Sequence, residues 1–349
     1  MDTQRLDSDL PEHVHDLVRR DFARLDPRLP ELLDRLARHG ASEIWHKHGT
    51  FLDHLLGVWR ILAAWRQPRD VCLLGLMHSV YSNSFVRMKL FDSTRDGRDE
   101  VRALIGEEAE RLTHLFCEIQ RDELLSVAEP TNGTDGVEVS LYRTGEKVRL
   151  SRRDFATFLV VTMADFAEQH FAWQDRLFAG NPRVLWPGDS RPGLWMSLNA
   201  WLAQRAARCG AEPLPPVFES CSAQLSGEAE REARDLYWQV VRETSEGDDH
   251  ERARELLQKC VRANPFIGEP HVLLAQIAIG AGRWDEALAE ARAALDLLGT
   301  WGTAWDKRLG WDAWIAWARV IAKSARERAW PDSALGIVSL GEVRPAEAA

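Results

Sequence analysis

Long apolar runs are missing from this sequence. No stretch of eighteen consecutive apolar residues occurs, and a membrane-spanning helix needs about that length, so we expect no membrane span. The opening segment, MDTQRLDSDLPEHVHD, has neither a basic segment nor an apolar core, so no signal peptide is predicted. The sequence therefore favours a cytoplasmic protein.

Cysteine is scarce, and its spacing is not that of a disulfide framework or a cysteine-ligated metal site. The cysteines are odd in number and widely spaced, with no CxxC pattern, at positions 72, 117, 209, 221 and 260. We expect them to be reduced thiols on helix faces in the core.

Positively charged residues are fewer than negatively charged ones. The chain has 44 Lys and Arg against 54 Asp and Glu, which gives a net charge of −10. This balance argues against nucleic acid or an anionic membrane as the main partner, and an anionic substrate would need a local basic patch. With 349 residues, 45% hydrophobic and 28% charged, the chain is long enough for two globular domains.

The most informative stretch spans residues 49–83. Apolar residues recur at helical spacing over residues 51–66, a Gln-Pro pair interrupts the pattern, and residues 69–80 are apolar almost all round. These patterns predict an antiparallel helical hairpin in the core. His54 lies near the start of the first helix and His78 near the end of the second, so we expect the two imidazoles to meet.

A third polar residue lies in another apolar helix. Asp165 interrupts an apolar run in the segment 151–175. A buried, unpaired carboxylate is costly, so Asp165 should be paired, hydrogen-bonded or bound to a metal. His54, His78 and Asp165 make a ligand set suited to Mn, Fe, Zn or Ni rather than to Cu(I). The alternative is that both histidines are hydrogen-bonded core residues without a metal.

The order His54…His78-Ser79…Ala164-Asp165 resembles the H…HD…D pattern of the HD superfamily of metal-dependent phosphohydrolases. More closely, residues 45–175 resemble the hydrolase domain of the guanosine tetraphosphate synthetase/hydrolases. The segments that carry the resemblance are 49–54, 74–79, 105–112 and 163–165. The resemblance implies a helical HD-type domain, a divalent metal (Mn or Fe in preference to Zn) and a nucleotide or other phosphorylated substrate.

Two positions depart from the family pattern. The Asp of the HD doublet is Ser79, and the acidic pair that follows, which helps to activate water in that family, is Ser82-Asn83. We keep Ser79 and Asn83 as candidate catalytic residues because they occupy these positions. Serine is a poor metal ligand, so His114 or His48 could supply a missing one, as extra histidines do in the di-iron oxygenase branch of the superfamily.

Several segments around these residues could contact a substrate. Residues 82–99 are polar and contain basic side chains, so they are interpreted as a loop over the site. Residues 137–150 alternate with period two around a Thr-Gly-Glu turn, which predicts a β-hairpin. We expect Lys47, Arg87 and Tyr142 to contact an anionic substrate, and Glu168 or Gln169 to orient a ligand. Further helices are predicted at residues 10–25, 28–39, 99–121 and 193–208.

The C-terminal part contains an internal repeat. Shifts of 34 residues relate Ala253 to Ala287 and Cys260 to Ala294, and this period is typical of tetratricopeptide repeats. Stacked helical pairs of this kind bind a peptide or another domain, and a structural or dimer contact is the alternative.

The sequence thus predicts a mainly α protein in four parts. These are an HD-like metal-binding domain with one β-hairpin (1–178), a Pro/Trp-rich connector (179–226), tetratricopeptide-like repeats (227–330) and a disordered tail (331–349). Three functions stay open: a metal-dependent phosphohydrolase, an HD-type di-iron oxygenase, and an inert nucleotide-binding sensor or scaffold. Expected partners are a small anionic substrate, a protein or peptide at the repeats, and a second copy in a homodimer.

Overall fold

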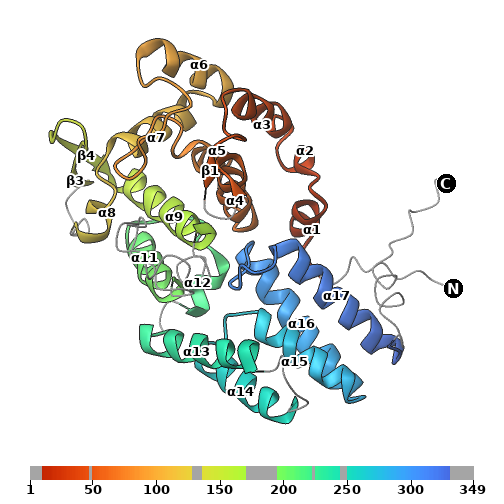
Figure 1. Cartoon of the computed structure of the whole chain (residues 1–349). Helices are drawn as coiled ribbons and strands as arrows, with labels where there is room; N and C mark the ends of the chain where they lie inside the picture. The colour runs from red at the N-terminus through yellow and green to blue at the C-terminus, as the bar shows by residue number, and fades with distance from the viewer. Residues whose placement is uncertain are drawn as a thin grey trace, which may run out of the picture. The chain divides into compact units, whose positions relative to one another are not determined.

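The structure, a computed structural model, describes residues 10–46, 49–127, 136–169, 195–221, 225–243 and 250–330. These residues form mainly helices, with two antiparallel two-stranded sheets (Figure 1), so the predicted mainly α fold is confirmed. None of the described helices is long and apolar enough to cross a membrane. Contacts divide the chain into two units, Asp16–Gly227 and Met1–His15 with Glu228–Ala349.

The first unit contains the end of α1 (Glu12–Arg19) and the helices and strands between it and Gly227. Its helices are α2 (Phe22–Leu25), α3 (Leu29–Arg38), α4 (Phe51–Ala64), α5 (Arg69–Met77), α6 (Arg95–Ile105), α7 (Glu107–Glu118), α8 (Glu123–Ser126), α9 (Arg152–Gln169), α11 (Met196–Arg208) and α12 (Pro216–Cys221). Its strands are β1 (Trp45–His46), β2 (Gly49–Thr50), β3 (Gly136–Ser140) and β4 (Lys147–Ser151). Within it α4, α5 and α9 pack against one another (Figure 1).

The predicted core hairpin is the pair α4 and α5. A capping box starts α4: the Thr50 side chain accepts from the Asp53 backbone N–H at 3.2 Å, and the Asp53 carboxylate accepts from the Thr50 N–H at 2.8 Å. Every residue of α5 from Val71 to Met77 is buried. Gly75 lets the two helices approach closely, because a Cβ atom there would overlap the side chain of Leu62.

Two predicted helices are each broken into two. The helix expected over residues 10–25 is interrupted at Arg20, whose φ is 58°, and the one over residues 99–121 at Gly106, whose φ is 93°. Both predictions were wrong at these points because the apolar periodicity runs on past the break. The loop expected over residues 82–99 is also shorter, since α6 begins at Arg95.

The predicted β-hairpin is present as β3 and β4. Val137 pairs with Leu150 and Val139 with Val148 in antiparallel register. The hairpin leads directly into α9, where the Ser151 hydroxyl accepts from the backbone N–H of Asp154 at 3.0 Å, as an N-cap does. The short pairing of β1 with β2 was not predicted.

The second unit is built from α13 (Gly227–Glu243), α14 (His250–Ala263), α15 (Glu269–Gly280), α16 (Trp284–Trp301) and α17 (Trp311–Glu327). The helices α14 and α16 begin 34 residues apart, and the four repeat positions 253, 260, 287 and 294 are all buried. These observations fit the predicted period, while the tetratricopeptide family itself stays a prediction.

The N-terminal end of α1 belongs to this second unit. The side chain of Leu10 lies beside Gly299, where an added Cβ would be 3.0 Å from Leu10 Cδ2. His15 is 5% exposed, and its Nδ1 lies 2.8 Å from the Arg319 guanidinium. The sequence predicted residues 1–15 to be part of the first domain. The structure assigns residues 10–15 to the other unit because their apolar side chains are buried there.

Candidate metal centre

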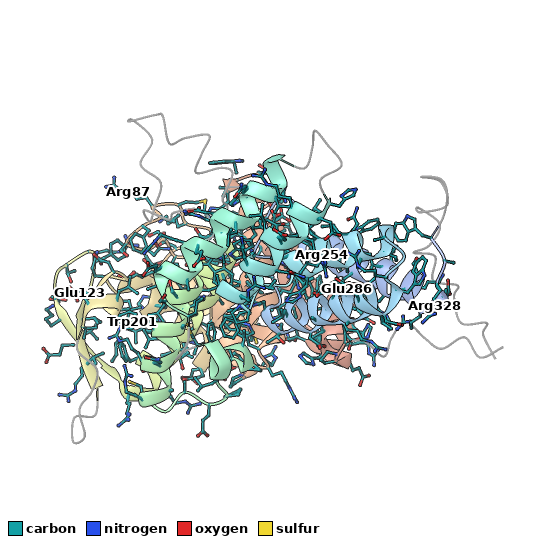
Figure 2. The ribbon with its side chains drawn as sticks, turned by 90° about the horizontal axis from the view of Figure 1, so that it is seen from below. Arg87, Glu123, Trp201, Arg254, Glu286 and Arg328 are labelled. Atoms are coloured by element: carbon teal, nitrogen blue, oxygen red, sulfur yellow. The ribbon has the colours of Figure 1, made fainter. Side chains whose placement is uncertain are left out.

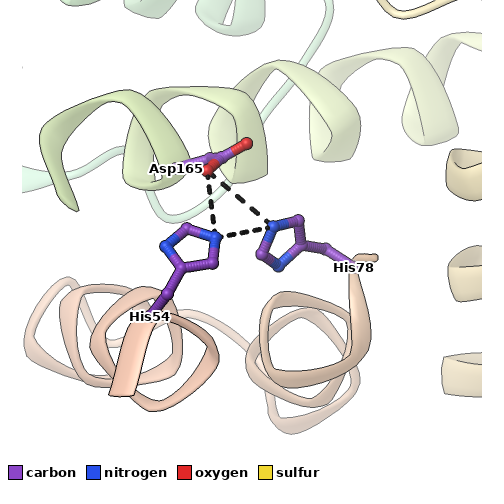
Figure 3. A group of neighbouring side chains, drawn as sticks. All are labelled: His54, His78 and Asp165. Atoms are coloured by element: carbon purple, nitrogen blue, oxygen red, sulfur yellow. Dashed lines mark hydrogen bonds and ion pairs between the residues drawn. The ribbon is translucent and has the colours of Figure 1, made fainter. Parts of the chain in front are cut away.

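Three side chains from three helices converge in the first unit (Figure 3). His54 lies in the first turn of α4, His78 is the C-cap of α5, and Asp165 lies on α9. The two Nε2 atoms are 3.2 Å apart, and Asp165 Oδ1 lies 3.5 Å from that of His54 and 3.8 Å from that of His78. Both imidazoles are buried, and the Asp165 side chain is 13% exposed. The three expected ligand atoms therefore do meet at one point.

Hydrogen bonds fix which nitrogen of each ring carries the proton. His78 Nδ1 donates to the Gly75 carbonyl at 2.8 Å, and His54 Nδ1 donates to the Glu168 carboxylate. A neutral imidazole has one N–H, so both Nε2 atoms present lone pairs to each other and to Asp165. Gln169 Nε2 donates to Asp165 Oδ1, but the two Nε2 lone pairs and this oxygen still face one another, which is unfavourable without a shared cation. This donor set fits a divalent metal ion.

The charge states of the ligands also suit a metal. Burial lowers the pKa of His78 to about 3, against the partial compensation of the Asp165 charge, so its ring is neutral near pH 7. Burial alone would raise the pKa of Asp165, but the pKa lies below its usual value overall, and the permanent charge of Arg121 is among the causes. Neutral imidazoles and an ionised carboxylate are the forms that bind metals.

Glu168 supports the His54 ring from behind. It lies one helical turn after Asp165 on α9, is buried, and accepts the His54 Nδ1 proton. Gly57 on α4 makes room for it, since a Cβ there would lie 2.7 Å from Glu168 Cγ. A carboxylate behind a metal-binding histidine fixes the ring and makes it a better ligand. The expectation that Glu168 orients a ligand agrees with this contact.

Arg121 is a neighbour that sequence reasoning missed. Its side chain is 7% exposed, and Nη1 lies 3.8 Å from Asp165 Oδ2. Nη2 donates to the carbonyl of His78, and the guanidinium lies over the Phe116 ring at 4.1 Å. In the sequence it is one charged residue among many at the end of a helix, so no local signal marks it. The His46 ring, 4.3 Å from the His54 ring between centroids, was missed in the same way.

Ser79 and Asn83, which the sequence offered as candidate catalytic residues, bind each other. Asn83 Nδ2 donates to Ser79 Oγ at 2.8 Å, and Asn83 Oδ1 accepts from the backbone N–H of Phe85 and Val86 at 2.8 and 2.9 Å. Both side chains are buried. They form the turn that follows α5.

The other predicted site residues lie elsewhere. The His114 ring packs against Tyr81, with centroids 5.8 Å apart, and is not part of the ligand group. Tyr142 shares a hydrogen bond of 2.9 Å with Ser82. Arg87 is exposed and points away from the ribbon (Figure 2). Lys47 and His48 lie outside the described residues.

The basic loop expected over the site is largely paired within itself or with α7. Lys89 bonds Asp92 at 3.1 Å. Arg98 donates to the buried carboxylate of Glu110 at 2.8 and 3.0 Å. The charge of the basic side chains in this segment is therefore mostly neutralised.

Comparison with known proteins gives one match. Residues 35–121 match a domain of unknown function (DUF6817). The matched segment covers less than half of the chain. It contains His54, His78 and Arg121 and ends before Asp165 and Glu168. No curated protein and no solved structure matches the chain.

Proposed function

We propose that this protein is a metal-dependent hydrolase of a small phosphorylated molecule, with a nucleotide as the favoured substrate class. One divalent ion, Mn or Fe in preference to Zn, is held by His54, His78 and Asp165. The observation that carries the proposal is the convergence of three acceptor atoms, with both Nδ1 protons already engaged elsewhere. The HD-like order of these residues in the sequence supports it.

Each of these residues would have a distinct role in such a site. A bound divalent ion would lower the pKa of a water molecule and polarise a phosphoryl oxygen. His54 and His78 present their Nε2 lone pairs, and Glu168 holds the proton on His54 Nδ1. Asp165 offers Oδ1 to the ion while Oδ2 faces Arg121. Three protein ligands leave further coordination positions for water and substrate.

An iron oxygenase is a second candidate, favoured by the same ligand set. Two histidines and one carboxylate with open positions are typical of non-haem Fe(II) oxygenases. The di-iron form needs more ligands, and His114 lies against Tyr81 instead. Oxygen consumption by anaerobically Fe(II)-loaded protein would favour this candidate over the hydrolase.

A sensor that binds a nucleotide without cleaving it is favoured by a different observation. The neutral pair of Ser79 and Asn83 stands where the hydrolase family has acidic residues that assist water. In this case the metal and the nucleotide bind, but no phosphate is released.

Metal analysis of the purified protein tests the proposal. We expect about one divalent ion per chain in the wild type, its loss in His78→Ala, and a roughly 10- to 100-fold weaker metal affinity in Glu168→Gln. His114→Ala is the control and should keep the ion. Phosphate release from nucleoside polyphosphates by the Mn²⁺-loaded protein then separates the hydrolase from the sensor. A wild type without stoichiometric metal would reject both enzyme candidates.

A further inference from the structure

One nitrogen of the Arg121 guanidinium, Nη1, has no oxygen acceptor at hydrogen-bond distance among the described residues. Nε donates to the Phe116 carbonyl at 3.3 Å, and Nη2 donates to the His78 carbonyl and approaches Ser79 Oγ at 3.5 Å. Within the described part of the chain, Nη1 has no oxygen acceptor at hydrogen-bond distance, because Asp165 Oδ2 lies 3.8 Å away. A guanidinium this deeply buried normally has its donors satisfied, so Nη1 is available to a ligand.

The position of Nη1 is fixed in advance. The guanidinium stacks on Phe116 and is held at Nε and Nη2 by two backbone carbonyls. Nη1 therefore points to the outer oxygen of Asp165, whose inner oxygen faces His54 and His78. A donor held in place before binding loses little entropy when a ligand arrives.

The local charge favours an anion. The nearby Ser79 and Asn83 are neutral. Among the described residues, the carboxylate that forms an ion pair with Arg121 is that of Asp165. A divalent ion would share that same carboxylate, and Glu168 would balance only part of the added charge. A buried cluster with excess positive charge is stabilised by an anionic ligand.

We infer that Arg121 is the second anchor for the substrate's phosphoryl group, with one phosphoryl oxygen at the metal and another at Nη1. The guanidinium fork matches the oxygens of a phosphate better than an ammonium does. This inference rests on the proposed metal site and adds the residue that selects an anionic substrate. This is the kind of contact that the sequence predicted for Lys47, Arg87 and Tyr142.

Binding of inorganic phosphate to the full-length, Mn²⁺-loaded protein tests this role. Isothermal titration calorimetry gives the phosphate affinity, and elemental analysis of the same samples gives the metal content. We expect Arg121→Gln to keep its metal and to bind phosphate at least about tenfold more weakly, since a charge-assisted hydrogen bond is lost. Arg121→Lys should be intermediate, because it keeps the charge but not the fork.

Arg143→Gln is the matched control. Arg143 also donates to the segment after α5, to the Tyr81 carbonyl at 3.2 Å and to Ser82 Oγ at 2.7 Å, but its ion pair is with Glu118. This variant should bind phosphate as the wild type does.

Three outcomes would overturn the inference. The first is unchanged phosphate affinity in a metal-loaded Arg121 variant, and the second is a metal-loaded wild type that does not bind phosphate. The third is metal loss in both Arg121 variants, which would make Arg121 a support for Asp165 only. Each of these leaves the metal site standing, whereas a metal-free wild type would reject the proposed function as well.

Discussion

His78 does two separate tasks with its side chain and its backbone. The ring binds the Gly75 carbonyl through Nδ1 and presents Nε2 to the candidate metal centre. Its own carbonyl accepts from Arg121 and from the Cys117 thiol. Replacing His78 by alanine removes the ligand and the ring's bond to Gly75 but keeps both bonds to the His78 carbonyl, so the variant should remain folded.

Glu269 is a buried acid of the second unit. Its Oε1 accepts from the backbone N–H of Trp305 at 2.6 Å and of Asp306 at 3.1 Å. Burial raises the pKa of Glu269 to about 7, and the charge of Asp306 adds to the effect. Asp306 itself is paired with Arg308 and accepts from the Tyr237 hydroxyl at 2.6 Å.

The raised pKa of Glu269 predicts a pH-dependent stability. Between the usual pKa of 4.5 and about 7 the folded state binds more protons than the unfolded state. The free energy of unfolding should therefore fall as pH rises through this range, by no more than about 3 kcal/mol, and change no further above it. Glu269→Gln keeps an oxygen for both N–H donors and should flatten this dependence in urea unfolding between pH 5 and 8. Parallel pH curves for the two proteins would contradict the prediction.

At the scale of the elements, Gly106 decides that α6 and α7 are two helices. Its φ of 93° and ψ of 167° lie in a region that only glycine adopts readily. No atom lies within 4 Å of a Cβ built there, so a larger residue would meet backbone strain and no steric clash. The helix break positions the end of α7, and hence Arg121, beside α5.

This predicts opposite effects for two glycine substitutions. Gly106→Ala should lower the free energy of unfolding by about 1–3 kcal/mol through backbone strain. Gly280→Ala is the control: it is the exposed last residue of α15, it also has open space around a built Cβ, and its φ is not positive. That change should be neutral or stabilise by up to about 1 kcal/mol. Similar effects of both changes in urea unfolding would contradict the account of Gly106.

At the scale of the whole molecule, the first described residues belong to the same unit as the C-terminal helices. The second unit combines residues 10–15 with the helices from α13 onward, and all ligands of the candidate metal centre belong to the first unit. The partner of the helical repeats, a peptide, another protein or a second copy, stays a prediction.

The division into units predicts which helices a substitution near the N-terminus destabilises. Leu10→Ala removes a side chain that is 7% exposed, so it should destabilise the second unit by about 2–5 kcal/mol. Hydrogen-exchange mass spectrometry should show faster exchange in α16 and α17, while the metal content of the full chain stays unchanged. Faster exchange confined to α4, α5 and α9 would contradict the division into units.

The sequence by itself determined the helices that carry the candidate ligands and the burial of these helices, but not where two other predicted helices break. Apolar periodicity identified α4, α5 and α9, and the same patterns placed His54, His78 and Asp165 inside them. The turn chemistry at residues 144–146 identified the β-hairpin. These features were predictable because helix and strand periodicity depends on residues that are close in the chain.

Only the tertiary structure determined which residues each buried helix face contacts. It brought Arg121 and His46 beside the ligands, placed His114 against Tyr81, and paired Ser79 with Asn83. Periodicity shows that a side chain is buried but not which residue lies across the core from it. That partner is set by how separate helices pack, through contacts between residues far apart in the chain.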